Sequence, residues 1–127
     1  MKKIGFITNN KIFAQSLVAS IAKLPDMEFE LYLLLNIHQA VLDAEVLSID
    51  VAVVDMVAEL SEHTLEVEQI CENLRHAVPG CRILLLVPQD DTHSRGAALR
   101  AVKNKIADDY VFNDLSLAYL LAKLSAL

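Results

Sequence analysis

The sequence has few of the residues that turn or cross-link a chain. Tryptophan is absent, and the 127 residues include only 3 glycines, 3 prolines and 2 cysteines. So few glycines and prolines leave little room for tight turns and predict long helices and strands. The two cysteines, Cys71 and Cys81, lack the spacing of a metal or redox motif. We therefore expect two reduced, partly buried thiols in a cytoplasmic protein.

Positive charge is also scarce. The chain has 11 Lys and Arg residues against 17 Asp and Glu residues, a formal net charge of −6 at pH 7. Such a balance disfavours non-specific binding to nucleic acid or to an anionic membrane. No apolar run is long enough to span a membrane. The N-terminal apolar run is broken at Asn9 and Asn10, too early for a signal peptide.

Hydrophobic residues are abundant, at 54% of the chain. Together with the length, this predicts one well-packed domain over residues 1–127. Short β-branched and leucine-rich runs alternate with segments of helical periodicity. The expected strands are 3–7, 28–35, 49–54, 81–87 and 110–112. The expected helices are 11–24 (with Ile12 in its apolar pattern and Pro25 ending it), 37–47, 64–78, 94–106 and 115–127, with a polar loop over 59–62.

Five strand–helix repeats of this length predict a parallel sheet with helices on both faces, a three-layer α/β/α fold. The first strand is followed by Thr8, Asn9 and Asn10, with no glycine. A phosphate-cradling loop needs glycine for close backbone approach, so a dinucleotide or P-loop site is not favoured. Asp55 directly follows the buried run 49–54. It therefore lies at the carboxyl edge of the sheet, where ligands and chemistry collect in such folds.

Three motifs together suggest a family. They are Asp55 after the third strand, the run 84–91 followed by 98–101, and the segment Ala107-Asp108-Asp109-Tyr110-Val111 leading into the fifth strand. Over nearly its whole length the chain resembles the receiver domain of bacterial two-component response regulators. The resemblance implies the CheY-like, flavodoxin-like (βα)5 fold, a place in a phosphorelay, and Asp55 as the phosphoacceptor.

The other positions of receiver chemistry depart from the family pattern. The family holds Mg²⁺ with two acidic residues after the first strand, and Thr8 and Asn9 stand there. Val87 occupies the position of a Thr or Ser hydroxyl, and Asn113 that of a lysine. Neutral oxygens beside one carboxylate make a poor Mg²⁺ site. We therefore expect no cofactor, with Mg²⁺ required only if Asp55 is an active phosphoacceptor.

The resemblance also marks Tyr110 as the aromatic that switches between exposed and buried positions in the family. Its working partner would be a hydroxyl, where this chain has Val87. An ordinary strand aromatic is the simpler interpretation. The spacing from Ala101 to Tyr110 exceeds that of the family, so we expect an extra turn or an altered loop there.

The remaining polar residues give no catalytic constellation. The four histidines, at 38, 63, 76 and 93, show no ligand spacing. No serine or cysteine triad can be assembled. Asp90 and Asp91 are expected in a solvated loop, with one of them capping the next helix. Arg95, Arg100, Lys103 and Lys105 make that helix basic, either as a solvated surface or as a docking surface for an acidic partner.

The last helix is apolar nearly all round, more than one buried stripe requires. Extra apolar surface usually marks a partner site. In the receiver family the fourth helix, fifth strand and fifth helix form the common dimer surface. We therefore expect a homodimer or partner contact at four residues or their neighbours: Leu117, Tyr119, Leu120 and Leu124. A frayed helix, or one covered by another domain, remains open.

The sequence thus supports three hypotheses. The first is a non-enzymatic signalling module, a pseudo-receiver that acts through protein–protein contacts without standard Mg²⁺-dependent phosphorylation. The second is an active receiver phosphorylated on Asp55. The third is a small-molecule or nucleotide-binding flavodoxin-like domain with a deep pocket at the carboxyl ends of the strands.

Overall fold

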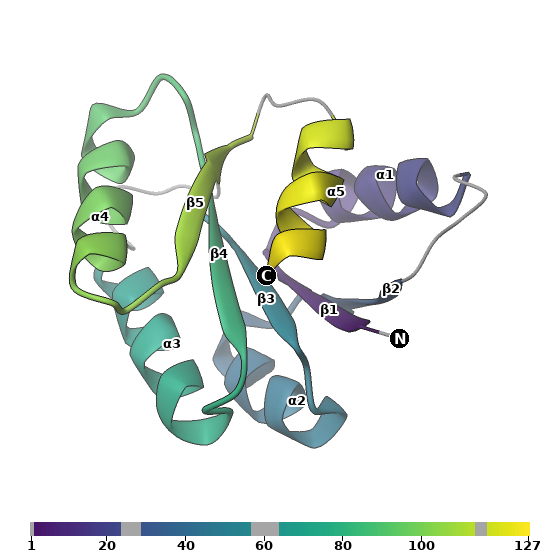
Figure 1. The fold of residues 1–127 in the computed structure, drawn as a ribbon, viewed down its shortest axis with the longest axis horizontal. Helices are drawn as coiled ribbons and strands as arrows, with labels where there is room; N and C mark the ends of the chain where they lie inside the picture. Colours follow the sequence, from purple (N-terminus) through teal and green to yellow (C-terminus); the bar gives the residue numbers. More distant parts are fainter. Residues whose placement is uncertain (1, 24–28, 57–63, 114–116) are drawn as a thin grey trace.

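A computed structural model describes residues 2–23, 29–56, 64–113 and 117–127. Five parallel strands form one sheet in the order β2-β1-β3-β4-β5 (Figure 1). The strands are β1 (Lys2–Ile7), β2 (Phe29–Leu34), β3 (Val51–Asp55), β4 (Arg82–Val87) and β5 (Asp109–Phe112). The helices are α1 (Lys11–Ala22), the 3-10 turn η1 (Ile37–Gln39), α2 (Ala40–Leu47), α3 (Thr64–Ala77), α4 (Thr92–Lys103) and α5 (Leu117–Ala126).

The helices cover the two faces of the sheet. Helices α1 and α5 lie on one face, and α2, α3 and α4 lie on the other (Figure 1). Alternate residues of each strand point to opposite faces, so Val53 belongs to the α1–α5 core and Val54 to the core beneath α2, α3 and α4. The predicted three-layer α/β/α fold with a five-stranded parallel sheet is confirmed.

The third strand begins later than expected. Ser48 adopts a left-handed conformation with φ 56° and ends α2. Ile49 is buried but lies before the strand, and the Asp50 carboxylate accepts a 2.8 Å hydrogen bond from the Lys3 backbone N–H. The strand then runs from Val51 through Asp55, so the carboxylate is the last residue of β3 itself.

Two sequence expectations about burial were wrong. Ile12 is 81% exposed, because Ala14 and Ile21 face the sheet and Ile12 lies roughly 160° around the helix from Ala14. Cys71 and Cys81 are fully buried, at 0% and 1% exposure, instead of partly buried. Burial raises the pKa of Cys71 to about 12 and that of Cys81 to about 11, which leaves both thiols protonated and unreactive.

The sequence predicts an extra turn or an altered loop between α4 and β5, and the connection there passes through a left-handed residue. Helix α4 ends at Lys103, and Lys105 takes a left-handed conformation with φ 61°. The backbone N–H groups of Ile106 and Ala107 both donate to Ala101 O, at 2.8 and 3.1 Å. Pro25 and the expected loop 59–62 lie outside the described residues. No helix in the described part of the chain is long and apolar enough to cross a membrane.

Candidate functional site: the carboxyl edge of the sheet

Asp55 lies at the carboxyl edge of the sheet, between β1 and β4. Its exposure is 7%, so little of the carboxylate reaches solvent. The strand pairings bring the end of β1 next to it, because Ile7 pairs with Val54. Thr8, directly after β1, is even more buried at 2%. The edge that would hold a receiver's acidic cluster thus carries a threonine packed beside one aspartate.

A short hydrogen bond joins these two residues. Thr8 Oγ1 donates to Asp55 Oδ2 at 2.6 Å. The same hydroxyl oxygen accepts from the Asn10 backbone N–H at 3.0 Å, which fixes its orientation. Asn10 in turn caps α1 by accepting from the Phe13 N–H at 3.0 Å. The β1–α1 loop is therefore built to direct a hydroxyl donor at the carboxylate.

This donor set does not fit Mg²⁺. The ion prefers near-octahedral oxygen ligands that include carboxylates and water. The Thr8 hydroxyl donates its hydrogen to Asp55, and the following residue, Asn9, is exposed. Within residues 2–23, 29–56, 64–113 and 117–127, no three His, Cys, Asp or Glu side chains gather where they could hold a metal. The two residues after β1 thus bring no carboxylate to Asp55, where the receiver family has an acidic pair.

The two other degenerate positions lie on the neighbouring strands. Val87 ends β4 and is 0% exposed, so an aliphatic side chain fills the place of the hydroxyl. The Asn113 backbone N–H donates to Val87 O at 2.9 Å, which brings these two positions together, while Asn113 itself is exposed. Neither side chain carries the hydroxyl or ammonium group that would contact a phosphoryl oxygen.

Tyr110 packs against Phe112 on β5. The two ring centroids are 5.9 Å apart and the rings are nearly perpendicular, at 83°. Arg95 of α4 lies 6.0 Å from the Phe112 ring centroid. Tyr110 is half-buried in this arrangement and also packs on the core under α4. An edge-to-face pair of this kind stabilises a fixed position for the ring.

The loop before α4 has the structural role expected of it. Asp91 accepts from the backbone N–H groups of His93 and Ser94, at 3.0 and 3.3 Å, and from Ser94 Oγ at 2.8 Å. These bonds, that from the Ser94 hydroxyl first, hold the pKa of Asp91 below its ordinary value. The prediction that one aspartate of the pair caps the next helix is confirmed.

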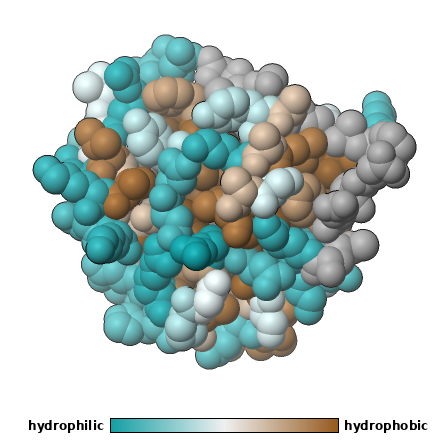
Figure 2. Space-filling view, in the orientation of Figure 1, coloured by the Kyte–Doolittle hydropathy of each residue, from teal (hydrophilic) through white to brown (hydrophobic). Residues whose placement is uncertain are grey.

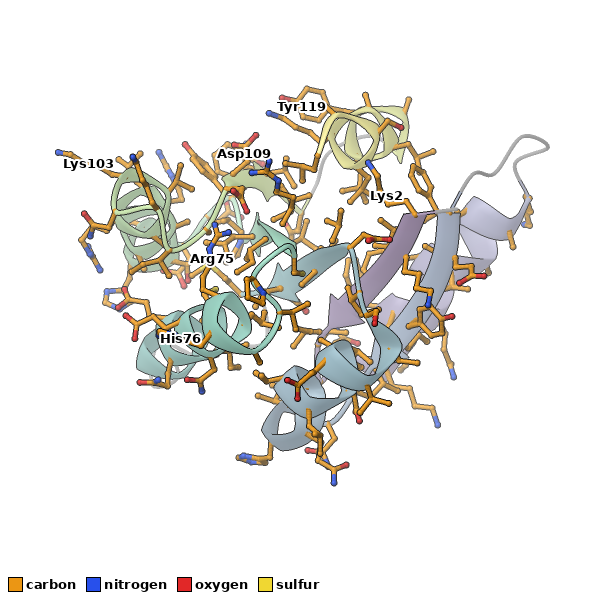
Figure 3. All side chains as sticks on the ribbon, turned by 60° about the horizontal axis from the view of Figure 1, so that its bottom comes forward. Lys2, Arg75, His76, Lys103, Asp109 and Tyr119 are labelled. Atoms are coloured by element: carbon orange, nitrogen blue, oxygen red, sulfur yellow. The ribbon has the colours of Figure 1, made fainter. Side chains whose placement is uncertain are left out.

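The edge formed by α4, β5 and α5 carries both charged and apolar groups. Figure 3 places Lys103 on α4, Asp109 on β5 and Tyr119 on α5. Lys123 Nζ lies 2.5 Å from Asp109 Oδ2 and 5.9 Å from the Tyr119 ring centroid. Leu99 and Tyr119 are 56% and 48% exposed. Figure 2 shows apolar residues interspersed with polar ones over this edge.

The apolar residues of α5 divide between core and surface. Leu120 and Leu124 are 6% and 0% exposed and pack in the core under α1 and α5. They are therefore unavailable as contact residues, which corrects the expectation for these two. Tyr119 remains on the surface with small neighbours, whereas the Leu117 side chain lies outside what the structure describes. The outward side of α5 is mostly alanine and serine: Ala118, Ala122, Ser125 and Ala126.

A pocket of about 210 Å³ opens between α1, α5 and the ends of β4 and β5. Phe13, Leu17 and Leu120 give it an apolar wall, and Ser16, Ser20 and Asn113 supply its polar groups. None of the described residues that line it is charged. A nucleotide phosphate would need a cation or a glycine-rich loop at such a place.

The sequence analysis did not predict a polar cluster at the amino end of β4, the end of the sheet opposite to Asp55. The Asp108 carboxylate accepts from Arg75 Nη2 at 2.9 Å, from Arg82 Nη1 at 3.3 Å and from the Ile83 backbone N–H at 2.8 Å. Arg75 Nε also donates to Ile106 O at 3.1 Å. The motif 107–111 contains Asp108, but the sequence does not show that α3, with Arg75, lies beside it in the fold (Figure 3).

The comparisons with known proteins concern the fold. No protein-family model and no curated protein sequence matches the chain. A response regulator receiver domain from Methanospirillum hungatei superposes with a TM-score of 0.71 at 17% identity, covering 99% of this chain and 92% of that one. The signal receiver domain of a LuxO-type repressor from Vibrio parahaemolyticus gives 0.75 at 9% identity, with 98% and 88% covered.

A third solved structure belongs to a protein assigned to pilus assembly (cpaE) from Burkholderia thailandensis. It gives a TM-score of 0.67 at 16% identity and covers 100% of both chains. At these identities the similarity concerns the fold. The strand order, the five parallel strands and the superpositions lead to one conclusion: the chain has the CheY-like fold of response-regulator receiver domains.

Proposed function

We propose that the protein is a receiver-like signalling module that acts through protein–protein contacts and without standard Mg²⁺-dependent phosphorylation. The hydrogen bond from Thr8 Oγ1 to Asp55 Oδ2 carries this proposal. Phosphoryl transfer to a carboxylate requires a cation that neutralises the charge on the phosphoryl oxygens. Here a buried hydroxyl occupies the side of the carboxylate that faces β1. On this proposal the module is cytoplasmic and non-enzymatic.

A small phosphodonor with Mg²⁺ tests the absence of phosphorylation. We expect the intact mass of the protein to remain unchanged after incubation with acetyl phosphate and Mg²⁺, because no bound cation assists transfer to Asp55. The control is Asp55→Asn, which removes the acceptor. A phosphate adduct on the wild-type chain that is missing from Asp55→Asn would establish the active receiver instead.

The nucleotide-binding alternative has less support. This alternative requires a deep pocket at the carboxyl ends of the strands, and the α1–α5 pocket is the described cavity most similar to that. None of the described residues that line it is charged. Its walls come largely from Phe13, Leu17 and Leu120. Such a lining suits a small apolar molecule better than a phosphate-bearing one.

The proposed contact surface is the edge made by α4, β5 and α5. Leu99 and Tyr119 supply exposed apolar area at its two sides, and Lys103 and the Lys123–Asp109 pair supply charge between and around them. Specific interfaces commonly combine exposed apolar side chains with polar and charged groups. We infer that two copies meet here about a two-fold axis, so that each α4 lies near the other α5.

Sedimentation analysis checks the dimer. We expect the wild-type protein to dimerise at micromolar to submillimolar concentration and the variant Leu99→Glu/Tyr119→Glu to be monomeric, because two charges would be buried without partners. Ile12→Glu is the matched control, since Ile12 is also an exposed apolar residue but lies on α1. A wild-type chain that stays monomeric throughout this range would contradict self-association.

A further inference from the structure

Charge is divided unevenly along the chain. Between Lys23 and Arg75 there is no lysine or arginine, although most of the 17 acidic residues fall in this stretch. The stretch forms β2, η1, α2, β3 and most of α3. Helices α2 and α3 lie next to each other on one face of the sheet (Figure 1), so a continuous part of the surface carries acidic groups and no described cation from this stretch.

A groove runs between these two helices. It has a volume of about 270 Å³ and is lined by Ile37, His38 and Val41 on one side and by Gln69, Ile70 and Asn73 on the other. The apolar members are half-buried against the core, and they leave an apolar floor. Gln69 and Asn73 hydrogen-bond to each other at 3.0 Å along the α3 side. The groove is therefore apolar at its base and polar at its rim.

Two exposed apolar residues lie on α2 outside the groove itself. Leu42 and Val46 are 56% and 73% exposed, and they lie one turn apart on the outward side of the helix. Ala40 and Ala44 take the opposite side and are fully buried. Single exposed apolar residues are common on surfaces, but Leu42 and Val46 lie in line on the same helix as one wall of an apolar groove and form a patch. This patch and the groove together are about as long as α2, roughly 12 Å at 1.5 Å per residue.

The charges at the rim have one sign. Glu45 is exposed one turn along from Val41, and Glu72 is exposed next to Asn73. Lys3 lies at the C-terminal end of α2, where its ammonium donates to Leu47 O at 3.1 Å. His76 is exposed further along α3 (Figure 3). An apolar groove with acidic borders is complementary to a helix that carries leucine-like residues on one side and Lys or Arg on its flanks.

We propose that the α2–α3 groove is a docking site for a basic amphipathic helix of a protein partner. Its apolar residues would cover Val41, Leu42 and Val46, and its cations would face Glu45 and Glu72. This surface lies apart from Asp55 and from the α4–β5–α5 edge. Its lining residues differ from those of both sites, so binding there can be tested separately from phosphorylation and from the dimer contact proposed above.

The test uses a fluorescent synthetic helical peptide of about 18 residues, with leucines at i, i+3, i+4 and i+7 and lysines on both flanks. We expect saturable binding in fluorescence anisotropy that weakens with added salt. A peptide of the same composition, scrambled so that the leucines no longer share one side, is expected to bind at least tenfold more weakly. Equal binding of both peptides would show that the binding is non-specific attraction, and it would overturn the proposal.

Two pairs of variants assign the binding to the groove. Leu42→Ser/Val46→Ser is expected to weaken binding at least tenfold, whereas Ile12→Ser, at an even more exposed site on α1, leaves it unchanged. Glu45→Lys is expected to weaken it several-fold, and Asp90→Lys, in the exposed β4–α4 loop, much less. Unchanged affinity in the first variant would overturn the proposal. So would a wild-type dimer that Leu42→Ser/Val46→Ser dissociates, since a second copy would then occupy the groove.

Discussion

Replacing Thr8 and Asn9 by aspartate is expected to give the protein a Mg²⁺ site that the wild-type chain lacks. The double variant would place two carboxylates beside Asp55, where Thr8 now donates its hydroxyl hydrogen. Three carboxylates are a suitable donor set for the ion. Without metal they repel each other, so the variant should unfold at a lower temperature than wild type. At a Mg²⁺ concentration about ten times the dissociation constant, binding adds about 1.4 kcal/mol to the free energy of unfolding.

Thermal unfolding with and without Mg²⁺, at matched ionic strength, measures this effect. Amide chemical shifts around Asp55 after addition of Mg²⁺ and beryllofluoride report whether a phosphoryl mimic also binds. The control is Asp55→Asn in the double variant, which removes the third ligand and should abolish the response. Saturable shifts in the wild-type protein itself would show that Thr8 gives way to the ion, and the pseudo-receiver proposal would be abandoned.

The fold was largely predictable because its strands are short, buried on both faces and rich in leucine and β-branched residues. The runs at β3 and β4 are apolar on both faces, so they fit only the interior of a parallel sheet. The helix that connects them determines how the two strands are arranged in it. Boundaries moved by a few residues where backbone conformation decides. Ser48 in its left-handed conformation is an example, because a serine gives no sequence signal for it.

The chemistry of the site was less predictable than its position. The sequence places Asp55 at the edge of the sheet but cannot show that the Thr8 hydroxyl points at it, since that depends on the bond from the Asn10 N–H. The sequence also did not show which side of each helix faces the core. Ile12 and Leu124 are both aliphatic and both fit a helical repeat, yet one is 81% exposed and the other 0%. Only the neighbouring elements decide between them.

Removing the Asp108 carboxylate is expected to destabilise the protein most strongly among the polar substitutions. The side chain is 16% exposed and contacts two elements: α3 through Arg75, and β4 through Arg82 and the backbone N–H of Ile83. Asp108→Ala would leave a part-buried N–H and two guanidinium groups without this acceptor. We expect a loss of about 2–3 kcal/mol in the free energy of unfolding, measured by urea denaturation.

The adjacent aspartate provides a matched control. Asp109 is 33% exposed and its ion pair with Lys123 lies at the surface, so Asp109→Ala should cost less than about 1 kcal/mol. Equal losses for the two variants would show that the position at the start of β5, and not the hydrogen-bond cluster, determines the cost.

The same cluster predicts how stability depends on pH. Burial raises the pKa of Asp108, but the bonds from the Ile83 N–H and the Arg75 guanidinium outweigh it and hold the pKa below the ordinary value of 3.8. The depressed value means that the carboxylate stabilises the fold fully above the unfolded-state pKa and loses this contribution as the pH falls through the folded-state pKa. Asp108→Asn cannot ionise, so below about pH 4 its free energy of unfolding should fall less steeply than that of wild type. Parallel curves for the two proteins in this range would assign the acid sensitivity to other carboxylates.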